Sequence, residues 1–171
     1  MLGTGLSWNA DETSAHGTFT LDAGNSFTVT SDLTDRSASA SGWDGKTLSK
    51  KGDGTLILSG NNTFSGGILL EDGQLTATSV NALGSGDIDN NGWLSLDANG
   101  AFNLSQNIDT HNGATLQISE GSTVQTNVLT QDAGSTLDVY ANTDAPVITS
   151  QQAKLDGTLN ISGLSSGDTR P

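Results

Sequence analysis

A short pattern of apolar and polar positions recurs along the chain. Each copy begins with a glycine, continues with one or two small or polar residues, and then alternates apolar with polar residues. The copies lie at residues 54–58, 73–77, 92–96, 113–118, 134–139 and 157–161. Their first glycines are separated by 19, 19, 21, 21 and 23 residues. Alternation predicts a β-strand with one buried face, and a repeat length of about 20 residues predicts one such strand in each coil of a solenoid.

Further strand candidates lie between these copies, and Asn, Asp and Gly turns separate them. They cover residues 67–71, 101–104, 122–129 and 146–150. Two or three short strands in each coil of about 20 residues predict an all-β fold, a right-handed parallel β-helix. Leucine-rich repeats have a similar period, but the chain lacks their fixed leucine and asparagine spacing. The glycine before each strand is expected to supply the positive φ of a sharp corner.

Stacking of the coils predicts two columns of buried side chains. The first column contains Leu56, Leu75, Leu94, Leu116, Leu137 and Leu159. The second contains Leu58, Ala77, Leu96, Ile118, Val139 and Ile161. Each buried Leu, Ile or Val contributes about 1.5–3 kcal/mol, against a backbone entropy cost of about 1–2 kcal/mol per ordered residue. A single coil therefore cannot be stable alone, and a terminal coil needs a cap.

The regularity of the pattern divides the chain. Residues 1–44 are expected to form less regular coils, with the same pattern at 17–21 and 24–29 and a protruding loop at 32–42. Residues 45–163 are expected to hold the regular repeats and a C-terminal cap, and residues 164–171 a tail or linker. Neither a signal peptide nor a recognisable terminus is found, so the targeting signal and anchor are expected outside this segment.

Composition and charge exclude several classes of function. A formal charge of −13 disfavours binding to nucleic acid, and the absence of cysteine excludes a disulfide framework or a thiolate zinc site. The longest apolar runs are far shorter than the roughly 20 residues that span a bilayer, so this segment is not expected to insert into a membrane. Half of the basic residues lie between Lys46 and Lys51, where a solvated turn is favoured over an anion-binding patch.

No constellation of residues predicts catalysis, a metal or a cofactor. The aspartates mostly lie beside glycine or asparagine in turns, so the paired carboxylates of a glycoside hydrolase are not indicated. Residues 87–92 resemble the start of a calcium loop, but Ala98 stands where a bidentate glutamate is required. His16 and His111 have no metal-spaced partner or nucleophile motif nearby. The chain is therefore not expected to be an enzyme.

Tryptophan offers the one candidate for contact with a partner. Trp93 lies between a turn glycine and inward-facing Leu94, so alternation directs its side chain outward. Trp8 and Trp43 flank the less regular region, where capping or core packing is expected.

One stretch resembles a known family. The segments GKTLSKKGDGTLILSGNNTFSGG (45–67), EDGQL (71–75) and ALGSG (82–86) resemble the passenger-associated strand repeat of autotransporters. The resemblance implies a β-helical passenger on the outer surface of a Gram-negative cell or secreted from it, next to the membrane barrel that exports it. A stretch of this length resembles the autochaperone region that precedes the barrel. Residues 1–60 further resemble actin-recruiting members, which implies a host actin-regulating protein as a partner.

Two functions are consistent with these observations. The leading hypothesis is a structural passenger segment that nucleates and templates folding, with the upstream β-helix and the downstream barrel of the same chain as partners. Parallel coils pair through contacts distant in sequence, which form slowly, and a preformed coil removes part of that cost. The alternative is an adhesive or host-protein-binding surface. Outward-facing Trp93 is the candidate residue for the binding function, whereas the leucine columns are the candidate residues for the folding function.

Overall fold

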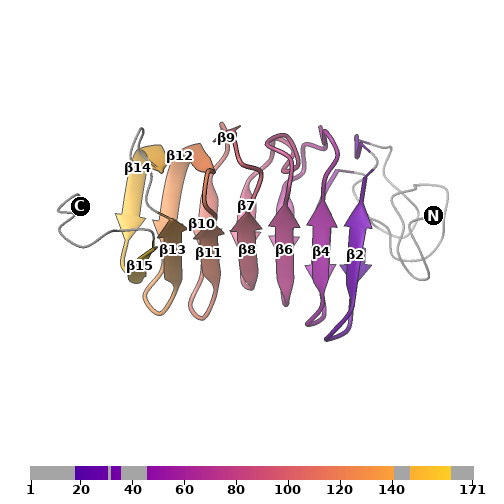
Figure 1. Ribbon diagram of the computed structural model, residues 1–171, viewed down its shortest axis with the longest axis horizontal. Helices are drawn as coiled ribbons and strands as arrows, with labels where there is room; N and C mark the ends of the chain where they lie inside the picture. Colours follow the sequence, from indigo (N-terminus) through magenta and orange to yellow (C-terminus); the bar gives the residue numbers. More distant parts are fainter. Residues whose placement is uncertain (1–17, 31, 36–45, 141–146, 163–171) are drawn as a thin grey trace.

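The computed structural model describes residues 18–30, 32–35, 46–140 and 147–162, and these residues form β-strands and turns without a helix. The strands stack side by side along the long axis of the molecule, with β2 at one end and β14 and β15 at the other (Figure 1). Among the described residues, therefore, no helix could cross a membrane.

The strands form two parallel sheets. The eight-stranded sheet contains β1 (Thr18–Thr20), β3 (Leu48–Lys51), β5 (Ile68–Leu70), β7 (Ile88–Asn90), β10 (Ile108–Thr110), β12 (Thr123–Gln131) and β14 (Ile148–Leu155), with β9 (Ala101–Asn103) paired to β12. The seven-stranded sheet contains β2 (Ser26–Val29), β4 (Thr55–Leu58), β6 (Gln74–Ala77), β8 (Trp93–Leu96), β11 (Thr115–Ile118), β13 (Thr136–Tyr140) and β15 (Thr158–Ser162).

The coils follow one another as the sequence repeat predicts. The stack has about 5 turns of about 22 residues each, and the predicted class, an all-β parallel β-helix, is confirmed. The recurring pattern forms the seven-stranded sheet. The weaker candidates at 67–71 and 101–104 contain β5 and β9, and those at 122–129 and 146–150 overlap the first parts of β12 and β14. Strands β3, β7 and β10 were not predicted, because each directs a polar residue inward (Lys50, Asn90 and Thr110) and so breaks the expected alternation.

The core lies between the two sheets. Leu56, Leu75 and Leu94 are register partners on successive strands of the seven-stranded sheet. On the other sheet Ile68, Ile88 and Ile108 are aligned in the same way. Identical side chains therefore stack directly above one another, and their apolar surface is removed from water by the coils on either side.

The glycines before the strands have two different physical roles. Gly73 has a φ of +70°, as the sequence analysis expected. Gly92, Gly54 and Gly157 do not have a positive φ, so the expectation is wrong for them. A side chain at Gly92 would place its Cβ 2.6 Å from the carbonyl oxygen of Gly73 in the preceding coil. At these positions glycine is needed because the backbone of the preceding coil passes too close for a side chain.

Two predicted features lie partly or wholly outside the described residues. Of the loop expected at 32–42, residues 32–35 are described. They pack against the stack, with Leu33 buried and the Asp32 carboxylate accepting from the backbone N–H of Asn61 at 2.8 Å. The tail expected at 164–171 lies outside the described residues.

We expect Gly92→Ala to lower the free energy of unfolding by about 1–3 kcal/mol, the usual cost of overpacking, because backbone of the preceding coil cannot move aside. Gly100→Ala is the matched control, since its Cβ would meet a side-chain methyl group of Val80 at 3.0 Å and φ is not positive there. Urea denaturation measures both. Equal losses for the two variants would contradict the steric role of Gly92.

Candidate functional site

The two predicted leucine columns are the first candidate site. Leu56, Leu75, Leu94, Leu116 and Leu137 in the first column and Leu58, Leu96, Ile118 and Val139 in the second are buried. Leu159 and Ile161 occupy the same columns, as register partners of Leu137 and Val139, but they are 54% and 38% exposed. The prediction of a buried core is therefore wrong for these two, because no described residue covers β15.

The last described coil exposes more apolar surface than any coil before it. Along the first column the exposed fraction rises from 1% at Leu116 to 5% at Leu137 and 54% at Leu159. Leu155 on β14 is also exposed, and it aligns with buried Gln131 on β12. The predicted C-terminal cap does not lie among the described residues. The described part of the stack thus ends on a surface with exposed apolar side chains.

Lys50 is a buried cation, whereas the sequence analysis favoured a solvated turn. Its Nζ donates to the carbonyl oxygens of Lys51 at 2.8 Å, Gly52 at 2.7 Å and Asp72 at 3.2 Å. Burial lowers the pKa of Lys50 from its ordinary value, and the charges of Asp72 and Asp53 oppose the shift. The ammonium group satisfies carbonyls of two successive coils at one corner, so it joins those coils together.

A polar column lies further along the same sheet, separated from Lys50 by buried Leu70. Asn90, Thr110 and Gln131 are register partners on β7, β10 and β12, and all are buried. The Asn90 amide donates to the carbonyl of Thr115 at 2.8 Å, and the Gln131 amide donates to the hydroxyl of Ser135 at 3.3 Å. These bonds tie strands of the eight-stranded sheet to the start of β11 and to the turn before β13. The sequence offered one signal, the recurrence of polar residues about one coil apart.

His111 joins three coils on the outer surface. Its Nδ1 lies 2.9 Å from the Asp132 carboxylate in the next coil, and its Nε2 contacts the Asp89 carboxylate in the previous one. Asp109 on β10 aligns with Asp89, so a further carboxylate lies near this cluster. The hydrogen bond to Asp132 raises the pKa of His111, burial opposes the rise, and Asp89 adds to it. A protonated imidazole can donate to both carboxylates at once.

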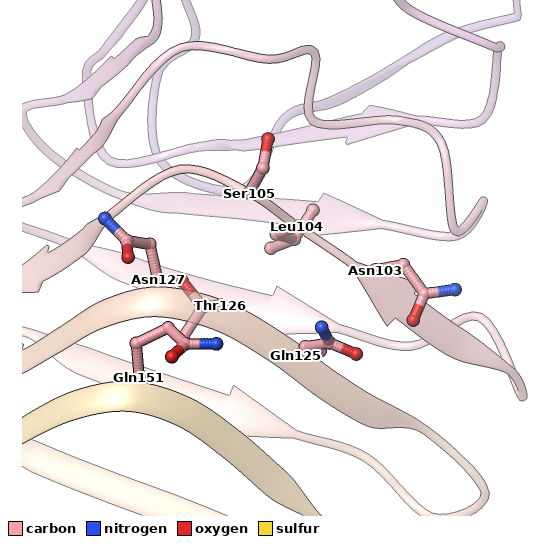
Figure 2. A pocket seen from close by; sticks show the side chains of 7 residues that line it. All are labelled: Asn103, Leu104, Ser105, Gln125, Thr126, Asn127 and Gln151. Atoms are coloured by element: carbon pink, nitrogen blue, oxygen red, sulfur yellow. The ribbon is translucent and has the colours of Figure 1, made fainter.

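The surface has two shallow hollows, with volumes of about 300 Å³ and about 280 Å³. The first is here called the amide hollow. It lies at residues 104–107, which connect β9 to β10, two strands that both pair with β12. Figure 2 shows the amide side chains around it, which come from three successive coils. It is lined by Asn103, Leu104, Ser105, Gln125, Thr126, Asn127 and Gln151, none of them charged or aromatic.

Trp93 is exposed to 39%, in agreement with the outward direction expected for it. Its indole N–H donates to the Gln117 side-chain oxygen of the next coil at 3.1 Å. Trp8, Trp43 and His16 lie outside the described residues. Residues 88–90 of the calcium-like segment form β7, and no group of three or more His, Cys, Asp or Glu among the described residues could hold a metal ion.

The comparison with family models gives one match. Residues 48–77 match the model of the Passenger-associated-transport-repeat family. They span β3 to β6 and include Lys50, Leu56 and Leu75. The resemblance to an autotransporter passenger repeat is confirmed over this stretch, and such a repeat implies a cell-surface or secreted location. No curated protein matches the chain.

We expect His111 to stabilise the stack in acid more than at neutral and alkaline pH. Because its folded pKa lies above the unfolded value of 6.5, its contribution is complete below that pH and is lost as the pH rises through the folded pKa. His111→Gln should therefore cost about 1 kcal/mol or less, since the group is partly exposed, and only on the acidic side. Thermal melts of both proteins from pH 5 to 9 measure the difference, and a difference that does not change with pH would contradict it.

Proposed function

We propose that the chain is a structural segment of an autotransporter passenger that nucleates and templates β-helix folding during secretion across the outer membrane. It acts through stacking of coils rather than through catalysis and uses no cofactor. The observation that carries the proposal is the uncovered coil at β14 and β15, where the leucine column continues but its last members are exposed. The passenger repeat at 48–77 supports the same role.

The physical advantage of such a segment lies in the cost of the first coil. A new parallel strand gains little until the chain has closed a loop of a whole coil, so unassisted pairing is slow. A coil that is already folded offers unpaired N–H and C=O groups and an apolar column to the arriving strand. The upstream β-helix and the downstream membrane barrel of the same polypeptide are the partners in this proposal.

The exposed apolar residues of β14 and β15 favour a further coil as the neighbour of this end. Leu155, Leu159 and Ile161 together present an apolar surface that water disfavours. The net charge of the whole chain, −13, opposes pairing between separate copies. A further segment of the same polypeptide, held close by its connection, is the occupant that this proposal assigns to the end.

Surface display of the passenger tests the role of the buried columns. Leu94→Glu and Leu116→Glu place an unpaired charge in the core, which costs about 3–5 kcal/mol, and should abolish display. Trp93→Ala should leave display intact, because the indole faces outward. Flow cytometry on intact cells measures both. Normal display of the two leucine variants would contradict the dependence of export on this core.

A second experiment separates templating from simple stability. Leu159→Glu should hardly change the melting temperature of the 171-residue chain, since Leu159 is largely exposed, but should lower the protease-resistant fraction of the displayed passenger. Thr158→Glu, an exposed residue on the opposite face of the same strand, is the matched control and should change neither quantity. If Leu159→Glu leaves protease resistance unchanged, the end coil is not a template.

Exposed Trp93 favours a second candidate function, an adhesive surface that binds a host partner. Tryptophan is enriched at the centres of binding sites, and the hydrogen bond to Gln117 holds this indole in place before any partner arrives. The resemblance of residues 1–60 to actin-recruiting members adds a host actin-regulating protein as one partner class. Loss of host-cell adhesion with normal display in Trp93→Ala would support this candidate.

A further inference from the structure

We propose that the outward face of β8, β11 and β13 binds a neutral oligosaccharide along the diagonal formed by Trp93, Gln117 and Tyr140. The inference rests on the second candidate function, the adhesive surface, and names the chemistry of its ligand. Three observations carry it: the register of the outward side chains, the fixed position of the indole, and a hollow on the same face.

The register places the three residues in line. Gln117 is the partner of Ser95, two residues after Trp93 on β8, and of Asp138, two residues before Tyr140 on β13. Each step along the line therefore moves one strand across and two residues along. From the spacing of parallel strands and the rise per residue, the Cα atoms of Trp93 and Tyr140 lie about 16 Å apart. Two aromatic residues thus lie at the ends of a line with an amide at its centre.

The indole of Trp93 lies across the sheet instead of projecting from it. Its N–H reaches the Gln117 oxygen on the next strand, and the hydroxyl of Ser95 donates to the same oxygen at 3.2 Å. Ser95 faces outward by alternation but is only 4% exposed, because the side chains around it cover it. An exposed aromatic ring that is already held in place can stack on the C–H face of a sugar ring, and little side-chain entropy is lost on binding.

A polar hollow continues the line from Gln117 to Tyr140. It is lined by Gln117, Ile118, Ser119, Glu120, Asp138, Val139, Tyr140 and Ser162, and it measures about 280 Å³. Hydroxyls, carboxylates and an amide beside an aromatic ring can accept from sugar hydroxyl groups and orient them. This Gln117 hollow differs from the amide hollow, which has no aromatic residue.

The charges of this face favour a neutral ligand. Glu120 and Asp138 are the charged residues of the hollow, and no Lys or Arg lines it. An anionic polysaccharide would be repelled by them and by the net charge of −13. A basic peptide is the competing occupant, but it would not need two aromatic rings held at a fixed spacing.

Titration calorimetry with defined probes tests the proposal on the 171-residue chain. The probes are three neutral hexasaccharides, cellohexaose, maltohexaose and fully N-acetylated chitohexaose, together with an oligogalacturonate of the same length and an octalysine peptide. We expect saturable binding of at least one neutral hexasaccharide and at least tenfold weaker binding of the oligogalacturonate. Trp93→Ala and Tyr140→Ala should each weaken binding at least tenfold, whereas Tyr140→Phe, which keeps the ring, should stay within threefold of the parent.

Gln125→Ala in the amide hollow is the matched control, and it should leave binding unchanged. Melting temperatures of all variants identify any that fail to fold, and Tyr140→Phe then still tests the role of the ring. The proposal is overturned if no neutral hexasaccharide binds, if Gln125→Ala weakens binding as much as Trp93→Ala, or if octalysine alone binds. Host-cell adhesion that needs Trp93 without any hexasaccharide binding would overturn the sugar chemistry and leave the adhesive function standing.

Discussion

The whole structure depends on one constraint, the parallel pairing of each strand with the strand one coil before it and one coil after it. This pairing satisfies the backbone groups of a coil only when both neighbours are present. It also fixes the register, so that a side chain in one coil lies directly over its counterpart in the next. The leucine columns, the polar column and the crowded glycines are all consequences of this single arrangement.

The constraint explains why a buried cation and buried amides are tolerated. Lys50 donates to corner carbonyls of its own coil and of the next coil, and Asn90 donates to the carbonyl of Thr115 in the next coil. Burial of an unpaired polar group costs about 1–3 kcal/mol, so these side chains stabilise the corners rather than weaken the core. His111 performs a similar connection on the outer surface, where protonation controls its strength.

The two faces of each strand then separate the two proposed functions. Inward-facing residues hold the coils together and, at β14 and β15, leave an apolar end that a further coil can cover. Outward-facing residues on the same strands, such as Trp93, lie at the surface, where they can contact a ligand. A passenger can therefore vary its binding surface while its folding remains unchanged, because alternate residues serve the two purposes.

The sequence by itself determined the repeat, the parallel β-helix, the leucine columns and the outward direction of Trp93. These features follow from the alternation and the repeat length, which are visible in the order of the residues. The sequence did not reveal β3, β7 and β10, whose inward polar residues are stabilised by hydrogen bonds to residues about one coil away. The buried state of Lys50, the His111 bridge and the line from Trp93 to Tyr140 were also decided by the tertiary structure. Each joins residues about one coil apart, and only the register of the stacked coils brings such residues together.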